Sequence, residues 1–315
     1  MTPPVTWLMP VLNAMPYLRA ALRSIADQDY PKQQILAWEN GSTDGSQAEL
    51  RRWIPDRIPG EIIFDRPLPP GQCRAALVER AATELCACQD ADDVSAPTRL
   101  SVQTRAMMAD PALVALGFRP YIVDHNDGRL PDWCYPLGDA ELRWRTKWKC
   151  SFNASAVMFR RSAVIGAGNY HDLDRAQDLD LWMRLAHSGR FKNLPDRLGS
   201  YRLHAANVTS GTLDYYPFEA RIADVNATML FPKMVRDEAL DLWHAAYPRR
   251  EYGRTRWKHL PKLFFAARAA ARAIGERDAY FTDTMFFRHQ IGCMVRNATD
   301  LQIRRRKFDL RGPIG

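Results

Sequence analysis

Three acids stand close together near residue 90, directly after a short run of small and apolar residues. The run at 85–88 reads as a buried strand, and Asp90, Asp92 and Asp93 follow its carboxyl end. On an extended backbone, Asp90 and Asp92 face the same side. Two carboxylates aimed at one point repel each other unless a cation lies between them, so the pair predicts a site for Mg²⁺ or Mn²⁺. The alternative is that Asp92 or Asp93 only caps the next helix, and we expect Asp93 to do so.

Polar residues also follow two other predicted strands. Glu39 and Asn40 come after residues 35–38, and a polar stretch begins just past Phe159. Because the carboxyl ends of parallel strands meet at one edge of a sheet, these residues and the acids near residue 90 are expected to line one crevice. A crevice at that edge fits a nucleotide.

Alternating strands and helices are predicted through the first two hundred residues. The predicted strands are residues 5–9, 35–38, 61–64, 85–88, 156–159, 191–194 and 198–203, with one or two more between 111 and 123. The predicted helices begin after Pro16, after the turn at 40–46, and at about 72, 98 and 177, with a short one after Arg160. The segment 132–149 has weak periodicity and reads as irregular. This order predicts an α/β fold, a Rossmann-like and mostly parallel sheet with helices on both faces.

The composition is that of a globular protein. Of the 315 residues, 46% are hydrophobic and 25% are charged. No apolar run reaches the length of a membrane span, and the N-terminal residues lack a signal-peptide pattern, so a cytoplasmic location is expected. The six cysteines show neither metal-site nor disulfide spacing, which predicts reduced thiols that mostly fill the core.

The excess positive charge is concentrated at the C-terminal end. The net charge is +8, and residues 211–315 hold 19 Lys and Arg against 12 Asp and Glu. This region reads as mostly helical, with a basic and apolar stretch at 257–274 and a basic cluster at 304–307. It indicates an anionic partner, such as the inner face of a membrane to which the protein would bind peripherally. The alternative is a helical cap with a solvated charged face, and no nucleic-acid motif is present.

Five motifs together resemble family-2 glycosyltransferases of the GT-A fold. They stand in that family's order and spacing, at residues 9–13 (MPVLN), 39–46 (ENGSTDGS), 90–93 (DADD), 177–182 (QDLDLW) and 201–204 (YRLH). The resemblance covers about residues 5–210. It implies a GT-A catalytic domain at 1–210, with a nucleotide-sugar half at about 1–95 and an acceptor half at about 96–210. Residues 211–315 would form a basic, mainly helical extension.

The resemblance assigns the donor-binding side chains. Pro10, Leu12 and Asn13 would line the nucleoside pocket, with Glu39 accepting hydrogen bonds from the base. Asp90 would hold the ribose or the metal. The family usually has Asp where this chain has Asn40, which keeps hydrogen bonding but not charge.

The resemblance also assigns the metal ligands and the base. Asp92 would be the main metal ligand, and His204 would lie near the metal or the pyrophosphate. Asp178 would be the catalytic base, at a helix start that favours its ionised form, although it could also be only an N-cap. Because the cation neutralises the departing diphosphate, one carboxylate that takes the acceptor proton suffices, which implies inversion in a single displacement.

Four residues are candidates for contact with the acceptor. They are Gln177, where the family usually has Glu, together with Asn153, Ser155 and Trp148. Gln177 removes a second carboxylate beside Asp178. A tryptophan such as Trp148 could stack on a sugar, although packing explains it equally well.

The sequence therefore predicts a metal-dependent inverting glycosyltransferase. It would move a sugar from a nucleoside-diphosphate donor, most plausibly UDP-linked, to a hydroxyl of a growing glycan or lipid-linked acceptor. One alternative is a sugar-nucleotide binding protein without activity, motivated by Gln177 and Asn40. Another is a nucleotidyltransferase, which would normally show a glycine-rich loop with a basic residue after its first strand, and residues 10–15 show none.

Overall fold

A computed structural model describes residues 2–133, 135–205, 216–231 and 234–246, together with Pro261 and Phe265. The chain divides into two compact units, Met1–Arg143 with Cys150–Asp214, and Trp144–Lys149 with Tyr215–Gly315. The predicted domain boundary near Ser210 lies outside the described residues, as do nearly all of the predicted basic stretch at 257–274 and the whole cluster at 304–307.

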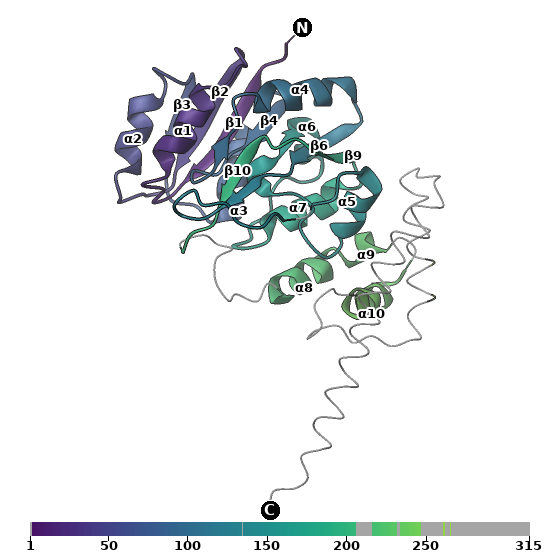
Figure 1. The fold of residues 1–315 in the computed structure, drawn as a ribbon. Coiled ribbons are helices and arrows are strands. Elements are labelled where there is room, and N and C mark those ends of the chain that lie inside the picture. Colours follow the sequence, from purple (N-terminus) through teal and green to yellow (C-terminus); the bar gives the residue numbers. More distant parts are fainter. Residues whose placement is uncertain are drawn as a thin grey trace, which may run out of the picture. The chain divides into compact units, whose positions relative to one another are not determined.

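A seven-stranded sheet forms the centre of the first unit (Figure 1). Its order is β3-β2-β1-β4-β8-β6-β9. The strands are β1 (Val5–Val11), β2 (Gln33–Glu39), β3 (Gly60–Phe64), β4 (Leu85–Cys88), β6 (Leu113–Phe118), β8 (Met158–Arg160) and β9 (Arg190–Leu194). Strand β8 runs antiparallel to β4 and β6, and the other neighbouring pairs in this sheet are parallel. The predicted mostly parallel sheet is confirmed.

Helices cover both faces of this sheet, because its strands are apolar on both sides. In β1, Trp7 and Met9 enter one buried cluster and Leu8 enters the other, as the alternation of side chains along a strand requires. The first cluster includes side chains of α1 (Leu18–Ala26), α2 (Ser46–Trp53) and α4 (Arg99–Ala109). The second includes side chains of α3 (Pro70–Arg80), α6 (Arg161–Gly166) and α7 (Gln177–Leu185).

Three cysteines fill the second cluster, as predicted. Cys73, Cys86 and Cys88 are buried free thiols. Burial raises the pKa of Cys86 to about 12 and the pKa values of Cys73 and Cys88 to about 11. These thiols are therefore protonated at neutral pH and pack as small apolar groups.

A second sheet has three strands, the first of which follows β4 in the sequence. Its order is β5-β10-β7, from β5 (Val94–Ser95), β7 (Tyr121–Val123) and β10 (Gly199–Arg202). Strand β10 is parallel to β7 and antiparallel to β5. The predicted strand at 198–203 therefore exists, but it belongs to this separate sheet, which was not predicted.

The expectation of an irregular segment at 132–149 is wrong in its middle. Residues Asp139–Arg145 form helix α5, which buries Ala140 and Leu142. Asp139 lies in the first turn, where a negative charge stabilises a helix. One turn later, Arg143 Nε lies 3.8 Å from Asp139 Oδ1. A helix of seven residues is too short to show clear periodicity in the sequence.

The described part of the second unit is helical, with α8 (Tyr216–Val225), α9 (Ala227–Leu230) and α10 (Arg236–Ala246). The ring of Trp148 packs against Trp144 and Phe231, and its Nε1 donates to Trp243 O at 3.3 Å. Trp148 is only 2% exposed. The predicted acceptor contact through Trp148 is therefore wrong, because the ring already packs in a core. Within the described residues, no helix is long and apolar enough to cross a membrane.

Candidate active site

The acids after β4 lie in a turn rather than on an extended backbone. Asp93 N donates to Asp90 O at 3.3 Å, and Asp90 N donates to Ser155 Oγ at 3.0 Å. Strand alternation therefore does not place Asp90 and Asp92 on one side, contrary to expectation. Each acidic side chain is instead oriented by its own ion-pair or hydrogen-bond partner. Ser155, predicted as an acceptor contact, instead supports this turn.

Arg99 holds the base of the turn from inside the protein. It is 1% exposed, and it donates to Gln89 Oε1 and Ser95 Oγ at 3.0 Å and to Cys88 O at 2.8 Å. No carboxylate in the described residues lies within ion-pair distance of Arg99, and its acceptors are neutral. Burial lowers the pKa of Arg99 to about 10. It therefore remains charged at neutral pH and fixes the strand end through neutral acceptors.

Asp90 forms an ion pair with an arginine that the sequence analysis did not single out. Arg74 Nη2 of α3 lies 2.7 Å from Asp90 Oδ1, and both side chains are mostly buried. The acids therefore have a neighbouring basic residue, which the sequence did not indicate. The Arg74 charge already compensates Asp90, which makes Asp90 a less suitable cation ligand than Asp92.

Asp92 faces His204, which the chain supplies from beyond β10. Asp92 Oδ2 and His204 Nε2 are 2.9 Å apart. The His204 ring packs on Tyr17 with a centroid distance of 4.8 Å, and Arg202 lies over the same tyrosine. Burial raises the pKa of Asp92, the neighbouring Asp90 charge raises it further, and the hydrogen bond with His204 opposes the rise.

This pair fits a divalent cation. Two adjacent ligands of an octahedral ion stand about 3 Å apart, which is close to the separation of Asp92 Oδ2 and His204 Nε2. An added positive charge would also relieve the cost of ionising Asp92 beside Asp90. In the part of the chain that the structure describes, no group of three or more His, Cys, Asp or Glu side chains forms a metal site. The protein would supply two ligands, and substrate phosphates and water the rest.

Asp93 does not cap a helix, contrary to expectation. Its Oδ1 accepts from Arg202 N at 2.8 Å, whereas α4 begins after Thr98 without a side-chain cap. Burial, followed by the charges of Asp92 and Asp90, raises the pKa of Asp93 well above its ordinary value. Asp93 thereby ties the acidic turn to β10, the strand that leads to His204.

Glu39 organises the glycine-rich turn after β2. It is 3% exposed, and its carboxylate accepts from Gly41 N, Ser42 N and Gln47 Nε2 at 3.2, 2.6 and 2.9 Å. The turn thus uses both carboxylate oxygens of Glu39, and the hydrogen bond from Glu39 to a nucleotide base stays a prediction. The sequence could not show the partners within the turn, since two of the donors are backbone groups and the third is the side chain of Gln47.

Residues 10–13, which are predicted to contact the nucleoside, are hydrogen-bonded to the same turn through Asn13. Asn13 adopts a left-handed φ of 48°, its N donates to Ser42 Oγ at 3.0 Å, and its Oδ1 accepts from Thr43 N at 2.8 Å. Pro10 is half-buried in β1, and Leu12 is 55% exposed beside Asn13. Asn13 thus positions the turn, and Leu12 offers an open apolar surface.

Asn40 connects the turn after β2 to the loop before α3. Its Nδ2 donates to Leu68 O at 2.9 Å and its Oδ1 accepts from Leu68 N at 2.7 Å. These paired hydrogen bonds hold the proline-rich loop before α3. An aspartate here would lack the amide donor, so the departure from the family pattern has a structural explanation.

Asp178 is the second residue of α7 and not its cap. The helix is preceded by Ala176 in a left-handed conformation, with no side-chain cap. Asp178 Oδ1 accepts from Leu179 N at 2.9 Å, and the thiol of Cys150 donates to Asp178 Oδ2 over 3.2 Å. Asp180, two residues further along α7, is buried and forms an ion pair with Arg184 at 2.6 Å.

Tyr170 is a buried titratable residue that the mechanism does not require. Burial raises the pKa of Tyr170 well above its ordinary value, and the charges of Arg74 and Asp178 act on it in opposite directions. Among the acceptor candidates, Gln177 is half-buried beside Asp178, and Asn153 is buried just before the short helix Ala154–Ala156.

Solved structures with the same fold define the class. S. aureus TarS 1–349 in complex with UDP-GlcNAc superposes with a TM-score of 0.62 at 14% identity, covering 96% of this chain and 92% of that one. The mannosyltransferase PcManGT from Pyrobaculum calidifontis, in complex with GDP-Man and Mn²⁺, gives a TM-score of 0.52 at 19% identity, covering 95% and 88%. The fold is that of a GT-A glycosyltransferase.

The family follows from the sequence comparison. The pattern of Glycosyl transferase family 2 matches residues 6–166, and the chain belongs to this family. The amylovoran biosynthesis glycosyltransferase AmsE from Erwinia amylovora is 29% identical over 189 residues, which cover 59% of this chain and 70% of AmsE. The resemblance to family-2 glycosyltransferases and the expected fold are both confirmed.

Proposed function

We propose that this glycosyltransferase transfers a sugar from a nucleoside-diphosphate donor, UDP-linked, to a hydroxyl of a glycan or lipid-linked acceptor in polysaccharide biosynthesis. The observation that carries the proposal is the pair Asp92 and His204, whose Oδ2 and Nε2 atoms are 2.9 Å apart where the turn after β4 meets the residues that follow β10. UDP-GlcNAc in TarS and the biosynthetic role in the name of AmsE support it.

Each group has a distinct task in this proposal. Asp92 and His204 would hold Mg²⁺ or Mn²⁺, whose charge would offset the charge that grows on the departing diphosphate. Arg74 would keep Asp90 in place for the ribose. Leu12 and Pro10 would contact the nucleoside, and Asn13 and Glu39 would hold the turn that shapes its pocket.

Asp178 would take the acceptor proton. Its Oδ1 is held by Leu179 N, and its Oδ2, which accepts from the Cys150 thiol, would use its remaining lone pair to receive the proton as the acceptor oxygen attacks the anomeric carbon. The bond from that carbon to the diphosphate oxygen breaks in the same displacement. The configuration therefore inverts, and no separate acid is needed. Gln177 and Asn153 are the remaining candidates for acceptor contact.

A thermal-shift screen tests the donor. UDP and UDP-sugars with Mn²⁺ should raise the melting temperature, GDP compounds should raise it less, and His204→Ala should abolish the part that depends on Mn²⁺. If no nucleoside diphosphate shifts the melting temperature, the donor assignment fails. A shift in the wild-type protein without transfer or donor hydrolysis would favour the inactive binding protein instead.

Asp178→Asn tests the base. It should lower the transfer rate by about 10²–10⁴-fold while binding of UDP with Mn²⁺ is kept. Asp174→Asn is the matched control, since Asp174 is an exposed acid in the loop before α7. Equal transfer rates in the two variants would remove Asp178 from the mechanism.

A further inference from the structure

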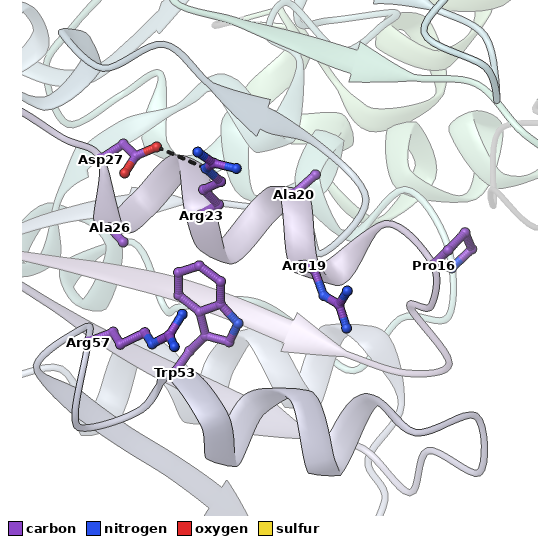
Figure 2. Close-up of a pocket in the computed structure, with 8 residues that line it drawn as sticks. All are labelled: Pro16, Arg19, Ala20, Arg23, Ala26, Asp27, Trp53 and Arg57. Atoms are coloured by element: carbon purple, nitrogen blue, oxygen red, sulfur yellow. Dashed lines mark ion pairs between the residues drawn. The ribbon is translucent and has the colours of Figure 1, made fainter.

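A groove lies on the first unit between α1 and the segment that follows α2 (Figure 2). Its volume is about 720 Å³, within the roughly 300–1,000 Å³ of small-molecule pockets. Small residues of α1 and Trp53 contribute apolar surface, and Arg19, Arg23 and Arg57 surround it. None of these residues belongs to the candidate active site.

The three arginines differ in how their charge is compensated. Arg19 forms two hydrogen bonds with the buried carboxylate of Glu49, at 3.0 and 3.2 Å. Arg23 lies 3.5 Å from Asp27, but both side chains are mostly exposed, so this pair is weak. For Arg57, no carboxylate of the described residues lies within ion-pair distance. Its guanidinium instead lies over the Trp53 ring, 5.0 Å from the centroid.

The groove therefore carries one uncompensated positive charge above an apolar floor. A guanidinium binds a carboxylate through two parallel hydrogen bonds, and Arg57 offers such a guanidinium among the residues that line the groove. The apolar floor suits the carbon face of a sugar ring. Pro16 and Asp27 mark the two ends of the groove near the ends of α1, so the groove is longer than one ring.

We infer that this groove binds an acidic sugar, a pyranose with a carboxylate, within an anionic glycan. The carboxylate pairs with Arg57 and draws Arg23 away from Asp27, and the ring packs on the floor beside Trp53. The site lies outside the proposed transfer reaction, and its binding is measured without a nucleotide donor.

Calorimetry with a short oligogalacturonate tests this site on the full chain. The wild-type protein should bind the oligomer, and the methyl ester of the same oligomer, which lacks the charge, should not bind. Arg57→Gln should weaken binding by about tenfold, the loss expected for one charged contact, and Arg23→Gln should weaken it less. Arg80→Gln is the matched control, since Arg80 is an exposed arginine of α3 paired with Glu61.

Several outcomes would overturn the inference. Equal binding of the acid and its methyl ester would remove the role of the carboxylate. Unchanged binding in Arg57→Gln, or equal losses in Arg57→Gln and Arg80→Gln, would place the ligand elsewhere. If inorganic phosphate or anionic lipid vesicles bind as tightly as the oligomer and with the same dependence on Arg57, the groove is a general anion site. Thermal melting of each variant confirms that it is folded.

Discussion

At the scale of single residues, the base and its neighbours determine the chemistry. The thiol of Cys150 donates to Asp178 Oδ2, the oxygen that would receive the acceptor proton. A hydrogen bond of this kind orients the carboxylate. The family pattern gave no reason to consider this residue. Cys150 is therefore a positioning residue that only the structure indicates.

Cys150→Ala should lower the transfer rate constant by about 2–10-fold, since one hydrogen bond is worth about 0.5–1.5 kcal/mol. Cys150→Ser keeps a donor and should recover most of the rate. Steady-state kinetics that separate kcat from the KM for the donor measure this, and the donor KM should stay constant. If the serine and alanine variants have the same kcat, the hydrogen bond does not contribute.

Residue types at the site were predictable, but their partners were not. Asp92, His204 and Asp178 follow from motif order in the sequence. Arg74 does not, because it lies on a helix 16 residues before Asp90 and only the packing of α3 brings the two together. Likewise, the sequence shows that Glu39 can accept hydrogen bonds but not which donors reach it first.

At the scale of elements, close packing at α3 positions the loop that leads to α7. A side-chain carbon at Gly71 would lie 2.1 Å from His171 O, so the two backbones touch. Gly71→Ala must push this loop outward, and the loop continues into the helix that carries Asp178. We expect a loss of about 1–3 kcal/mol in the free energy of unfolding and a larger loss in transfer than in UDP binding.

Gly166→Ala provides the control for Gly71→Ala. A side-chain carbon at Gly166, in the last position of α6, meets nothing within 4 Å. Chemical denaturation and transfer assays of both variants measure the difference. Wild-type stability and activity in Gly71→Ala would show that the loop can move without consequence.

The contact between α1 and α2 has a defined pH dependence. The hydrogen bond from Arg19, with help from Trp53 Nε1, lowers the pKa of Glu49. A lowered carboxyl pKa stabilises the fold above the unfolded-state value of about 4.3, and this stability is lost as pH falls through the folded-state value. Glu49→Gln should therefore cost about 1–2 kcal/mol at pH 7 and less in acid.

Denaturant unfolding at neutral and acidic pH measures the effect of Glu49→Gln. Glu61→Gln is the control, because Glu61 pairs with Arg80 at an exposed site where an ion pair contributes little. A difference between wild type and Glu49→Gln that stays constant across pH would contradict the role of the charge.

Elements with a clear apolar pattern were predictable from the sequence, whereas the pairing of β5, β7 and β10 into a separate sheet was not. Strands β1, β2 and β4 are apolar runs that end in polar turns, and α1 shows helical spacing at Leu18, Leu22 and Ile25. Strand β5 has two residues and β7 has three, too few to show alternation. Their sheet is defined by tertiary pairing with β10, which a single sequence does not reveal.

At the scale of the whole molecule, the uneven distribution of charge along the chain predicts an anionic partner. Residues 211–315 hold 19 basic against 12 acidic residues. We expect the protein to bind vesicles that contain anionic lipid, because basic segments are attracted to that surface. Binding should disappear at about 1 M salt, where the screening length falls to about 3 Å.

Vesicle sedimentation measures this association. Vesicles of neutral lipid are the control, and the Arg57→Gln variant should sediment like the wild type, since the groove is not the membrane contact. Equal binding to neutral and anionic vesicles, or binding to neither, would assign the charged region to a solvated helical face.

Asp92 and His204 are contributed by segments that lie 112 positions apart. No fragment that stops before residue 204 can bring the two together, however well its sheet has formed. During synthesis on the ribosome, the first half of the chain therefore folds without this pair. The pair assembles only after the last strand of the small sheet has emerged, so a prematurely terminated chain has neither the pair nor the chemistry that depends on it.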